Sequence, residues 1–246
     1  MCIRDSTKEY HVFDRVYGLN KNRIQGHNPS NNPVRSRIEK FELDTELYFD
    51  YFQSLLEEPP QPAYTGDFTP LYAALPKEGY ESISKGFRSR NIKVKVVFLM
   101  RDPVDRIWSQ FRMRRRNGKV TESNHSEDEQ LLQFYDLPGV ALRTRYENTI
   151  SRLEQVFDKQ GIFYCLFEEL FSDDSANALQ NFLGLTDLVF DCESKLNESP
   201  KSIPRLSTKT KHTIASYYKN TYEYCNLHFN AGDRWESFNY LSFAAT

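Results

Sequence analysis

Two short apolar runs stand out in the pattern of hydrophobic and polar positions along the chain. Residues 94–100 and 162–167 are rich in β-branched and large apolar side chains, and both runs are too short for a typical buried helix. Uninterrupted apolar runs of this length are typical of strands whose two faces are both covered. The sequence therefore predicts two buried strands, over residues 93–100 and 162–167.

Apolar residues recur at helical spacing through much of the remaining chain, and proline, glycine or capping residues bound these segments. The predicted helices cover residues 44–57, 77–90, 103–116, 130–134, 140–157, 175–182 (capped by Ser175) and 209–227. Polar segments with glycine or proline are predicted loops, over residues 17–37, 117–128 and 186–206. Strands that alternate with helices favour a single α/β domain over residues 1–246, with a central, mostly parallel sheet flanked by helices.

The junction that follows the first predicted strand concentrates features that bind anions. Asp102 is placed to cap a helix, and Pro103 fits the first helical position because its missing N–H has no partner there anyway. The N-terminus of a helix offers free N–H groups and a partial positive charge, which suits a phosphate. Arg101 adds a charged fork for the same anion, and the Ser109 hydroxyl adds a further donor. The alternative is an ordinary capped helix with Arg101 in a surface salt bridge.

The same junction carries a family resemblance. Residues 101–106, Arg-Asp-Pro-Val-Asp-Arg, followed by Ser109, resemble the 3′-phosphate-binding motif of sulfotransferases that use 3′-phosphoadenosine 5′-phosphosulfate (PAPS). The resemblance implies that Arg101 and Ser109 bind the 3′-phosphate of the nucleotide. It also implies a three-layer, P-loop-like α/β fold, PAPS as co-substrate and no metal.

A second resemblance lies near the N-terminus. Residues 8–15, Lys-Glu-Tyr-His-Val-Phe-Asp-Arg, are similar to the Glu-x-His-Phe-Phe-Asp segment of heparan sulfate 3-O-sulfotransferases and related bacterial enzymes. The resemblance implies that Glu9 is the general base, supported by His11 and Asp14, since a sugar hydroxyl is a poor nucleophile until it loses its proton. The alternation of residues here predicts an extended segment with Glu9 and His11 on one face. Taken alone, the segment also fits a surface glutamate and a core histidine.

Two later segments extend the resemblance. Residues 66–72, Gly-Asp-Phe-Thr-Pro-Leu-Tyr, resemble the Glu-Lys-Thr-Pro-x-Tyr segment at the substrate cleft, which implies that Asp67 and Thr69 bind substrate. Phe68 stands where the family often has lysine, which argues against a densely anionic, heparan-like acceptor. Lys201 and Arg205 fall where the family has a loop that closes over the nucleotide, and are candidates to bind phosphate.

One expected feature of the family does not occur in the sequence. We find no glycine-rich phosphate loop of the Pro-Lys-x-Gly-Thr-Thr type, and the segment with the candidate base begins at residue 8. In the family, the first strand and the phosphate loop precede that segment. We therefore expect an N-terminally truncated chain that lacks both, with residues 1–6 extraneous, and we expect it to bind nucleotide poorly and turn over slowly.

The composition of the chain argues against several classes of function. The 246 residues carry 32 Lys and Arg against 34 Asp and Glu, so no overall field attracts nucleic acid or membranes. No apolar run approaches the roughly 18 residues of a transmembrane helix. The four cysteines show no Cys-x-x-Cys spacing, which argues against a metal or redox site. The last three, at positions 165, 192 and 225, are compatible with one disulfide or with free thiols.

The sequence thus predicts a sulfotransferase that moves a sulfuryl group from PAPS to a hydroxyl or amine, with a carbohydrate as the expected acceptor. Two alternatives belong to other classes. One is a catalytically inactive relative that binds nucleotide or glycan. The other is a nucleic-acid binder that uses the basic residues between Arg112 and Lys119. The excess of acidic over basic residues in the chain argues against nucleic-acid binding. The sequence carries no indication of a compartment.

Overall fold

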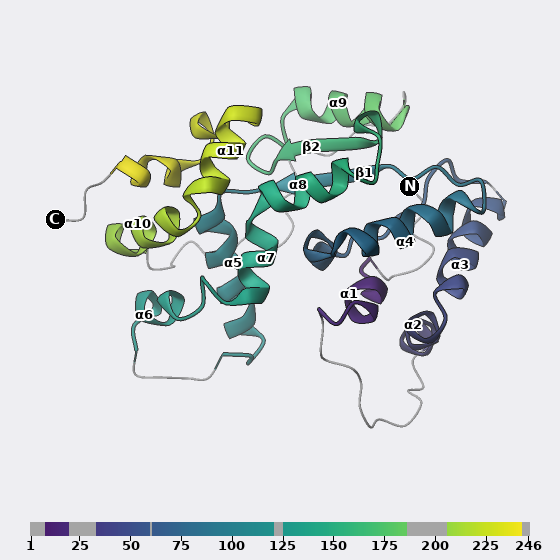
Figure 1. Cartoon of the computed structure of the whole chain (residues 1–246), viewed down its shortest axis with the longest axis horizontal. Coiled ribbons are helices and arrows are strands. Elements are labelled where there is room, and N and C mark those ends of the chain that lie inside the picture. Colours follow the sequence, from purple (N-terminus) through teal and green to yellow (C-terminus); the bar gives the residue numbers. More distant parts are fainter. Residues whose placement is uncertain (1–7, 20–32, 60, 121–124, 186–205, 243–246) are drawn as a thin grey trace. The chain divides into compact units, whose positions relative to one another are not determined.

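The computed structural model describes residues 8–19, 33–59, 61–120, 125–185 and 206–242, to which every structural statement below refers (Figure 1). The chain divides into two compact units. The first unit comprises the residues up to Val94 together with Ser151–Gly161, and the second comprises Lys95–Ile150 together with the residues from Ile162 onward. Each unit is described by itself, and the single domain that the sequence predicts remains a prediction.

The first unit is helical. Its elements are α1 (Val12–Val16), α2 (Pro33–Leu43), α3 (Thr45–Glu57), η1 (Pro70–Ala74), α4 (Lys77–Arg88) and η2 (Lys159–Gly161). Aromatic side chains from α1, α2 and α3 fill its core, and many of these rings meet edge to face, as Phe13 and Tyr48 do at 5.2 Å between ring centroids. Such pairs add about 0.5–1.5 kcal/mol each beyond the burial of apolar surface.

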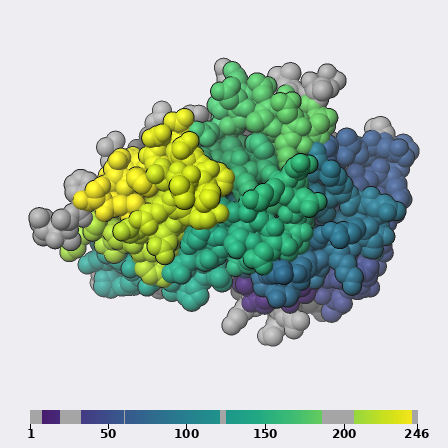
Figure 2. Space-filling model, turned by 45° about the horizontal axis from the view of Figure 1, so that its top comes forward, coloured from purple at the N-terminus to yellow at the C-terminus, as the bar shows by residue number. Residues whose placement is uncertain are grey.

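The second unit contains a parallel pair of strands, β1 (Val96–Met100) and β2 (Ile162–Leu166), with Val96 opposite Ile162 and Met100 opposite Leu166. Its helices are α5 (Pro103–Arg116), α6 (Glu127–Leu132), α7 (Pro138–Thr144), α9 (Asp173–Leu183), α10 (Thr208–Tyr217), α11 (Lys219–Phe229), η3 (Ala231–Asp233) and η4 (Glu236–Ser242). Helix α8 (Tyr146–Glu154) begins in the second unit and ends in the first. Helices α11, η3 and η4 form one contiguous area of the surface (Figure 2). Within the described residues, no helix has the length and apolar character needed to cross a bilayer.

The parallel strand pair confirms the predicted strands, but β1 is not buried on both faces as the sequence predicts. Val97 and Leu99 remain 42% and 41% exposed, whereas Phe98 and Met100 are buried. Successive side chains of a strand point to opposite faces, so one face of β1 packs into the core and the other is open. The strand is also shorter than predicted, because regular pairing with β2 begins only at Val96.

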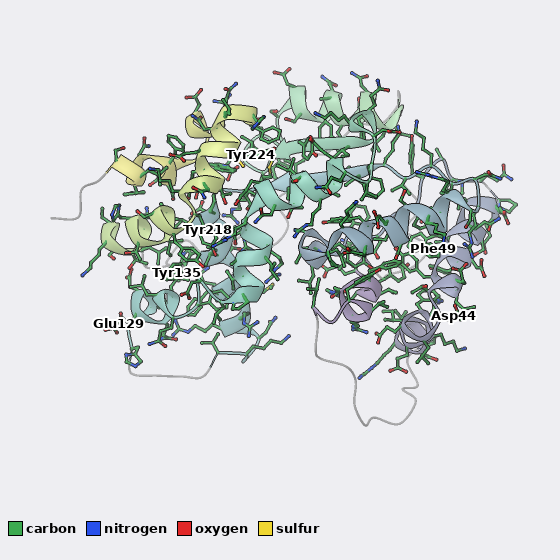
Figure 3. The ribbon with its side chains drawn as sticks, viewed as in Figure 1. Asp44, Phe49, Glu129, Tyr135, Tyr218 and Tyr224 are labelled. Carbon is green, nitrogen blue, oxygen red and sulfur yellow. The ribbon has the colours of Figure 1, made fainter. Side chains whose placement is uncertain are left out.

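Two predicted long helices are each divided, which corrects the prediction of one continuous helix over 140–157 and another over 209–227. The first breaks at Arg145, whose backbone is not helical (φ −77°, ψ 76°). The second breaks at Tyr218, whose buried hydroxyl donates a hydrogen bond to the Tyr135 carbonyl at 2.5 Å (Figure 3). Both breaks occur beside tightly packed tyrosines, so tertiary packing overrides a continuous helical pattern.

Helix boundaries elsewhere depend on caps. Asp102 caps α5 by accepting a hydrogen bond from the Val104 N–H at 3.0 Å, which confirms the predicted start at Pro103. Helix α9 is capped by Ser172 and not by Ser175 as predicted, because the Ser175 N–H is itself the donor to Ser172 Oγ at 3.2 Å.

The segments at the beginning of the chain depart further from the predictions. Residues 12–16 form a short helix, so the predicted extended segment is wrong there. Helix α2 begins at Pro33, inside the segment predicted as a loop, because proline suits the first helical turn.

Gly86 lets α3 and α4 approach closely, since a Cβ at this position would overlap the ring of Phe49. We expect Gly86→Ala to lower the free energy of unfolding by about 1–3 kcal/mol because it overpacks the aromatic core. Urea unfolding followed by circular dichroism measures the change. Gly139→Ala in α7 is the matched control, since nothing lies within 4 Å of its Cβ. We expect it to be neutral or stabilising by up to about 1 kcal/mol. Equal effects of the two variants would contradict the packing argument.

Candidate functional site

Three predicted site residues in the first unit are joined through His11. Its Nδ1 lies 2.9 Å from Asp14 Oδ2, and its Nε2 lies 3.1 Å from Glu9 Oε2. Asp14 is fully buried in α1, whereas about half of the Glu9 side chain is exposed. The imidazole therefore links a carboxylate inside the protein to one at its surface.

The two carboxylates raise the pKa of His11 above its ordinary value of 6.5. The hydrogen bond to Asp14 is the largest cause, burial of the ring opposes it, and the negative charges of Asp14 and Glu9 add to it. A protonated imidazole donates a hydrogen bond to each of the two carboxylates, so His11 connects Asp14 and Glu9 through both of its ring nitrogens.

The raised pKa has a consequence for stability. Because the pKa of His11 is higher in the folded protein than in the unfolded chain, its contribution is fully present below about pH 6.5 and is lost as the pH rises through the folded-state value. We expect the difference in unfolding free energy between the wild type and His11→Asn to be largest near about pH 5.5 and to shrink towards about pH 9. Asparagine is chosen because it tolerates the left-handed backbone of this position. Urea unfolding across this range measures the difference, and one that does not change with pH would contradict the assignment.

Asp67 and Thr69 lie in a buried hydrogen-bond network of the first unit. Asp67 Oδ1 accepts from Thr69 Oγ1 at 2.6 Å, from the Thr69 N–H at 3.1 Å and from the Tyr10 N–H at 3.4 Å. Its Oδ2 accepts from the hydroxyls of Tyr72 at 2.9 Å and Tyr48 at 3.1 Å. Burial raises the pKa of Asp67, and these hydrogen bonds oppose the rise. The carboxylate is thus occupied within the protein, and its predicted contact with substrate remains a prediction.

Arg101 and Ser109 belong to the second unit, at the end of β1 and on α5. Arg101 Nη2 lies 3.7 Å from Asp105 Oδ2, and the guanidinium lies 5.1 Å from the ring centroid of Phe167. Asp105 and Ser109 are four residues apart on α5 and therefore share a face of the helix. The half-buried Arg101 side chain consequently reaches towards the helix face that carries Ser109.

The turn between β1 and α5 is held by the buried carboxylate of Asp102. Besides capping α5, it accepts from the Tyr222 hydroxyl at 2.6 Å and from the Ser237 N–H at 2.8 Å. Burial raises the pKa of Asp102, and the bonds from Tyr222, Ser237 and Val104 oppose this. Helices α11 and η4 thus fix the backbone beside Arg101.

Two further groups at this turn are not among the sequence-predicted site residues. The Tyr146 hydroxyl donates to the Arg101 carbonyl at 2.8 Å. Glu168 accepts from the Asp102 N–H at 3.1 Å and from Trp235 Nε1 at 3.0 Å. No local sequence pattern signals these long-range contacts.

The exposed ring of Phe167 lies beside Arg101 and contacts a second exposed ring, that of Phe171. Phe167 and Phe171 are 38% and 51% exposed, and their rings meet edge to face at 5.9 Å between centroids. The signal that identifies Phe167 is the strand register, because the residues that follow Met100 and Leu166 must lie side by side in a parallel pair.

Lys201 and Arg205 lie outside the described residues. Within the described part of the chain, no group of three or more His, Cys, Asp and Glu side chains could hold a metal ion. Cys165 and Cys225 are both buried free thiols.

Comparisons with known proteins place these observations in context. A family model described as a sulfotransferase domain matches residues 80–225, which is more than half of the chain. Among solved structures, the chain is similar to a sulfotransferase from Alicyclobacillus acidocaldarius, with 17% sequence identity and a TM-score of 0.57. That similarity covers 92% of this chain and 84% of the other. A comparison with curated proteins gave no significant match.

Proposed function

Because the chain belongs to the sulfotransferase domain family, we propose that it transfers a sulfuryl group from PAPS to a hydroxyl or amine of a carbohydrate. The chain has the α/β, P-loop-like fold of a sulfotransferase, and sulfuryl transfer is the reaction of its family. The observation that carries the proposal is the contact of His11 with both Glu9 and Asp14, which provides a supported base at the protein surface.

In the proposed donor site, Arg101 and Ser109 bind the 3′-phosphate of the nucleotide. Arg101 lies just before the first turn of α5, and Ser109 lies six residues after Pro103 on the same helix. The proposed site combines a guanidinium, a hydroxyl and the helix dipole around one anion. Phe167 offers an exposed ring beside Arg101, on which the adenine base stacks. Lys201 and Arg205 supply further phosphate contacts in this proposal.

In the proposed reaction, Glu9 takes the proton of the acceptor hydroxyl as its oxygen attacks sulfur. A new O–S bond forms while the bond between sulfur and the 5′-phosphate oxygen breaks, and 3′,5′-ADP leaves with the electron pair of that bond. His11 Nε2 holds the Glu9 carboxylate in place, and Asp14 fixes the orientation of the ring through Nδ1. Asp67 and Thr69 complete the acceptor side in this proposal.

The surface beside Glu9 favours an acceptor that is not densely anionic. The Phe68 N–H donates to the Lys8 carbonyl at 2.8 Å, which places Phe68 next to the segment that carries Glu9. The Phe68 ring is exposed. An exposed aromatic ring offers apolar contact to the C–H face of a sugar and no charge to bind sulfate or carboxylate groups.

Two measurements test the proposal. Calorimetry with 3′,5′-ADP tests the donor site, and incubation with ³⁵S-labelled PAPS and a panel of neutral, acidic and amino oligosaccharides tests transfer. We expect nucleotide binding and label in at least one oligosaccharide. Binding without transfer to any acceptor would favour an inactive relative, and absence of both would overturn the proposal.

A further inference from the structure

An uncommon backbone conformation places the His11 ring between the two carboxylates. Its φ of 54° and ψ of 34° lie in the left-handed region, which residues with a Cβ rarely adopt. In this conformation its ring reaches Glu9, two residues earlier, and Asp14, three residues later. Such strained positions persist only when the surrounding structure holds them.

The left-handed conformation of His11 is stabilised by a segment about 60 residues further along the chain. The His11 N–H donates to Thr69 Oγ1 at 3.2 Å, and the N–H groups of Val12 and Phe13 both donate to the Tyr72 hydroxyl, at 3.2 and 3.4 Å. Helix α1 has only five residues and receives no cap from the His11 side chain. Two hydroxyls from the distant segment therefore satisfy three successive N–H groups at its beginning.

Asp67 orients both hydroxyls. Thr69 Oγ1 donates its proton to Asp67 Oδ1 at 2.6 Å, and the Tyr72 hydroxyl donates to Oδ2 at 2.9 Å. Because each proton points at the carboxylate, the oxygen lone pairs are left to accept from the backbone of residues 11–13. A single buried carboxylate thus sets the direction of both acceptors.

We propose that Asp67, Thr69 and Tyr72 are positioning residues that hold His11 in its left-handed conformation, between Glu9 and Asp14. The inference rests on the proposed function for its catalytic meaning, since it assigns these residues to the support of the base. In this role the Thr-Pro-x-Tyr segment acts on the base through the backbone of residues 11–13, in addition to any contact with the acceptor.

Tyr48 provides a matched control. Its hydroxyl donates to the same oxygen of Asp67 as Tyr72 does, at 3.1 Å, and it too is buried. Within the described residues, however, it accepts none of the three N–H groups. Tyr48→Phe and Tyr72→Phe therefore each remove one hydrogen bond to Asp67 Oδ2. Only Tyr72→Phe also removes the hydroxyl that accepts from the N–H groups of Val12 and Phe13.

The pKa of His11, followed by NMR of its ring carbon–proton pair in the full chain, reports the position of the ring directly. We expect Tyr72→Phe and Thr69→Val to lower this pKa towards the ordinary value, because the ring moves away from Asp14 and Glu9. Thr69→Ser, which restores the hydroxyl, and Tyr48→Phe are expected to retain the wild-type value. Circular dichroism verifies that each variant is folded. An unchanged pKa of His11 in all variants, or an equal decrease of this pKa in Tyr48→Phe and Tyr72→Phe, would overturn the inference.

Kinetics separate this inference from the proposed function. In transfer assays with labelled PAPS, we expect Tyr72→Phe and Thr69→Val to lower kcat by roughly 10- to 100-fold while KM for PAPS stays within about twofold. If the pKa of His11 falls as expected but the wild-type protein neither binds 3′,5′-ADP nor transfers label, the proposed function fails and the positioning role stands. If Glu9→Gln abolishes transfer while Tyr72→Phe changes neither the pKa nor kcat, the positioning role fails alone.

Discussion

Replacing Glu9 with glutamine is expected to lower kcat for sulfuryl transfer by roughly 10²- to 10⁴-fold, the usual contribution of a general base. The amide keeps the size of the side chain but cannot accept the proton of the acceptor hydroxyl. Since Glu9 faces solvent and makes its contact with His11 at the surface, the fold and the binding of 3′,5′-ADP should be unaffected. Single-turnover transfer of ³⁵S from labelled PAPS measures the rate of each variant.

Glu81→Gln is the matched control for this variant. Glu81 is an exposed glutamate of the same unit whose ion pair is with Lys77, one turn away on α4. Its substitution should leave the rate unchanged. A Glu9→Gln variant with the wild-type rate would remove Glu9 from the mechanism, and a parallel loss of nucleotide binding would point to misfolding in place of lost chemistry.

Arg101→Ala is expected to weaken the binding of 3′,5′-ADP by roughly 10- to 150-fold, because a hydrogen bond to a charged group contributes about 1.5–3 kcal/mol. The half-buried guanidinium lies at the start of α5, where the dipole of the helix also favours the anion. Arg101→Lys should retain part of the affinity, since an ammonium keeps the charge and loses the fork. Isothermal titration calorimetry measures the three dissociation constants.

Comparison of two nucleotides makes this test specific for the 3′-phosphate. Adenosine 5′-phosphate lacks that group, so Arg101→Ala should change its affinity far less than that of 3′,5′-ADP. Arg88→Ala, at the exposed end of α4, controls for the loss of one positive charge from the chain. If Arg101→Ala weakens the binding of both nucleotides by the same factor, Arg101 does not act at the 3′-phosphate.

The elements around Arg101 were accessible to prediction because their signals are local. A capping aspartate followed by proline sets the beginning of α5, and the cap bond from Asp102 to the Val104 N–H spans only two residues. The parallel pairing of the two apolar runs then follows from their length and from the helices between them. The resemblance of residues 101–109 to a known motif supplied the proposed role of Arg101 and Ser109, which periodicity alone leaves open.

The breaks at Arg145 and Tyr218 could not be predicted in the same way. Both occur inside segments whose apolar spacing is helical throughout, and the bond that holds Tyr218 reaches Tyr135, 83 residues earlier in the chain. The exposed face of β1 is a similar case, since an apolar run does not specify how many of its faces are covered.

For the base, the sequence alone determined which residues are candidates, because Glu9, His11 and Asp14 stand at the spacing of a known segment. The tertiary structure alone decided that these three side chains meet. An extended segment would place Asp14 on the face opposite Glu9 and His11. The left-handed His11 and the short α1 instead bring a buried and an exposed carboxylate to one imidazole. The physical reason is that the hydroxyls of Thr69 and Tyr72, which stabilise this conformation, come from about 60 residues away, beyond the reach of any local pattern.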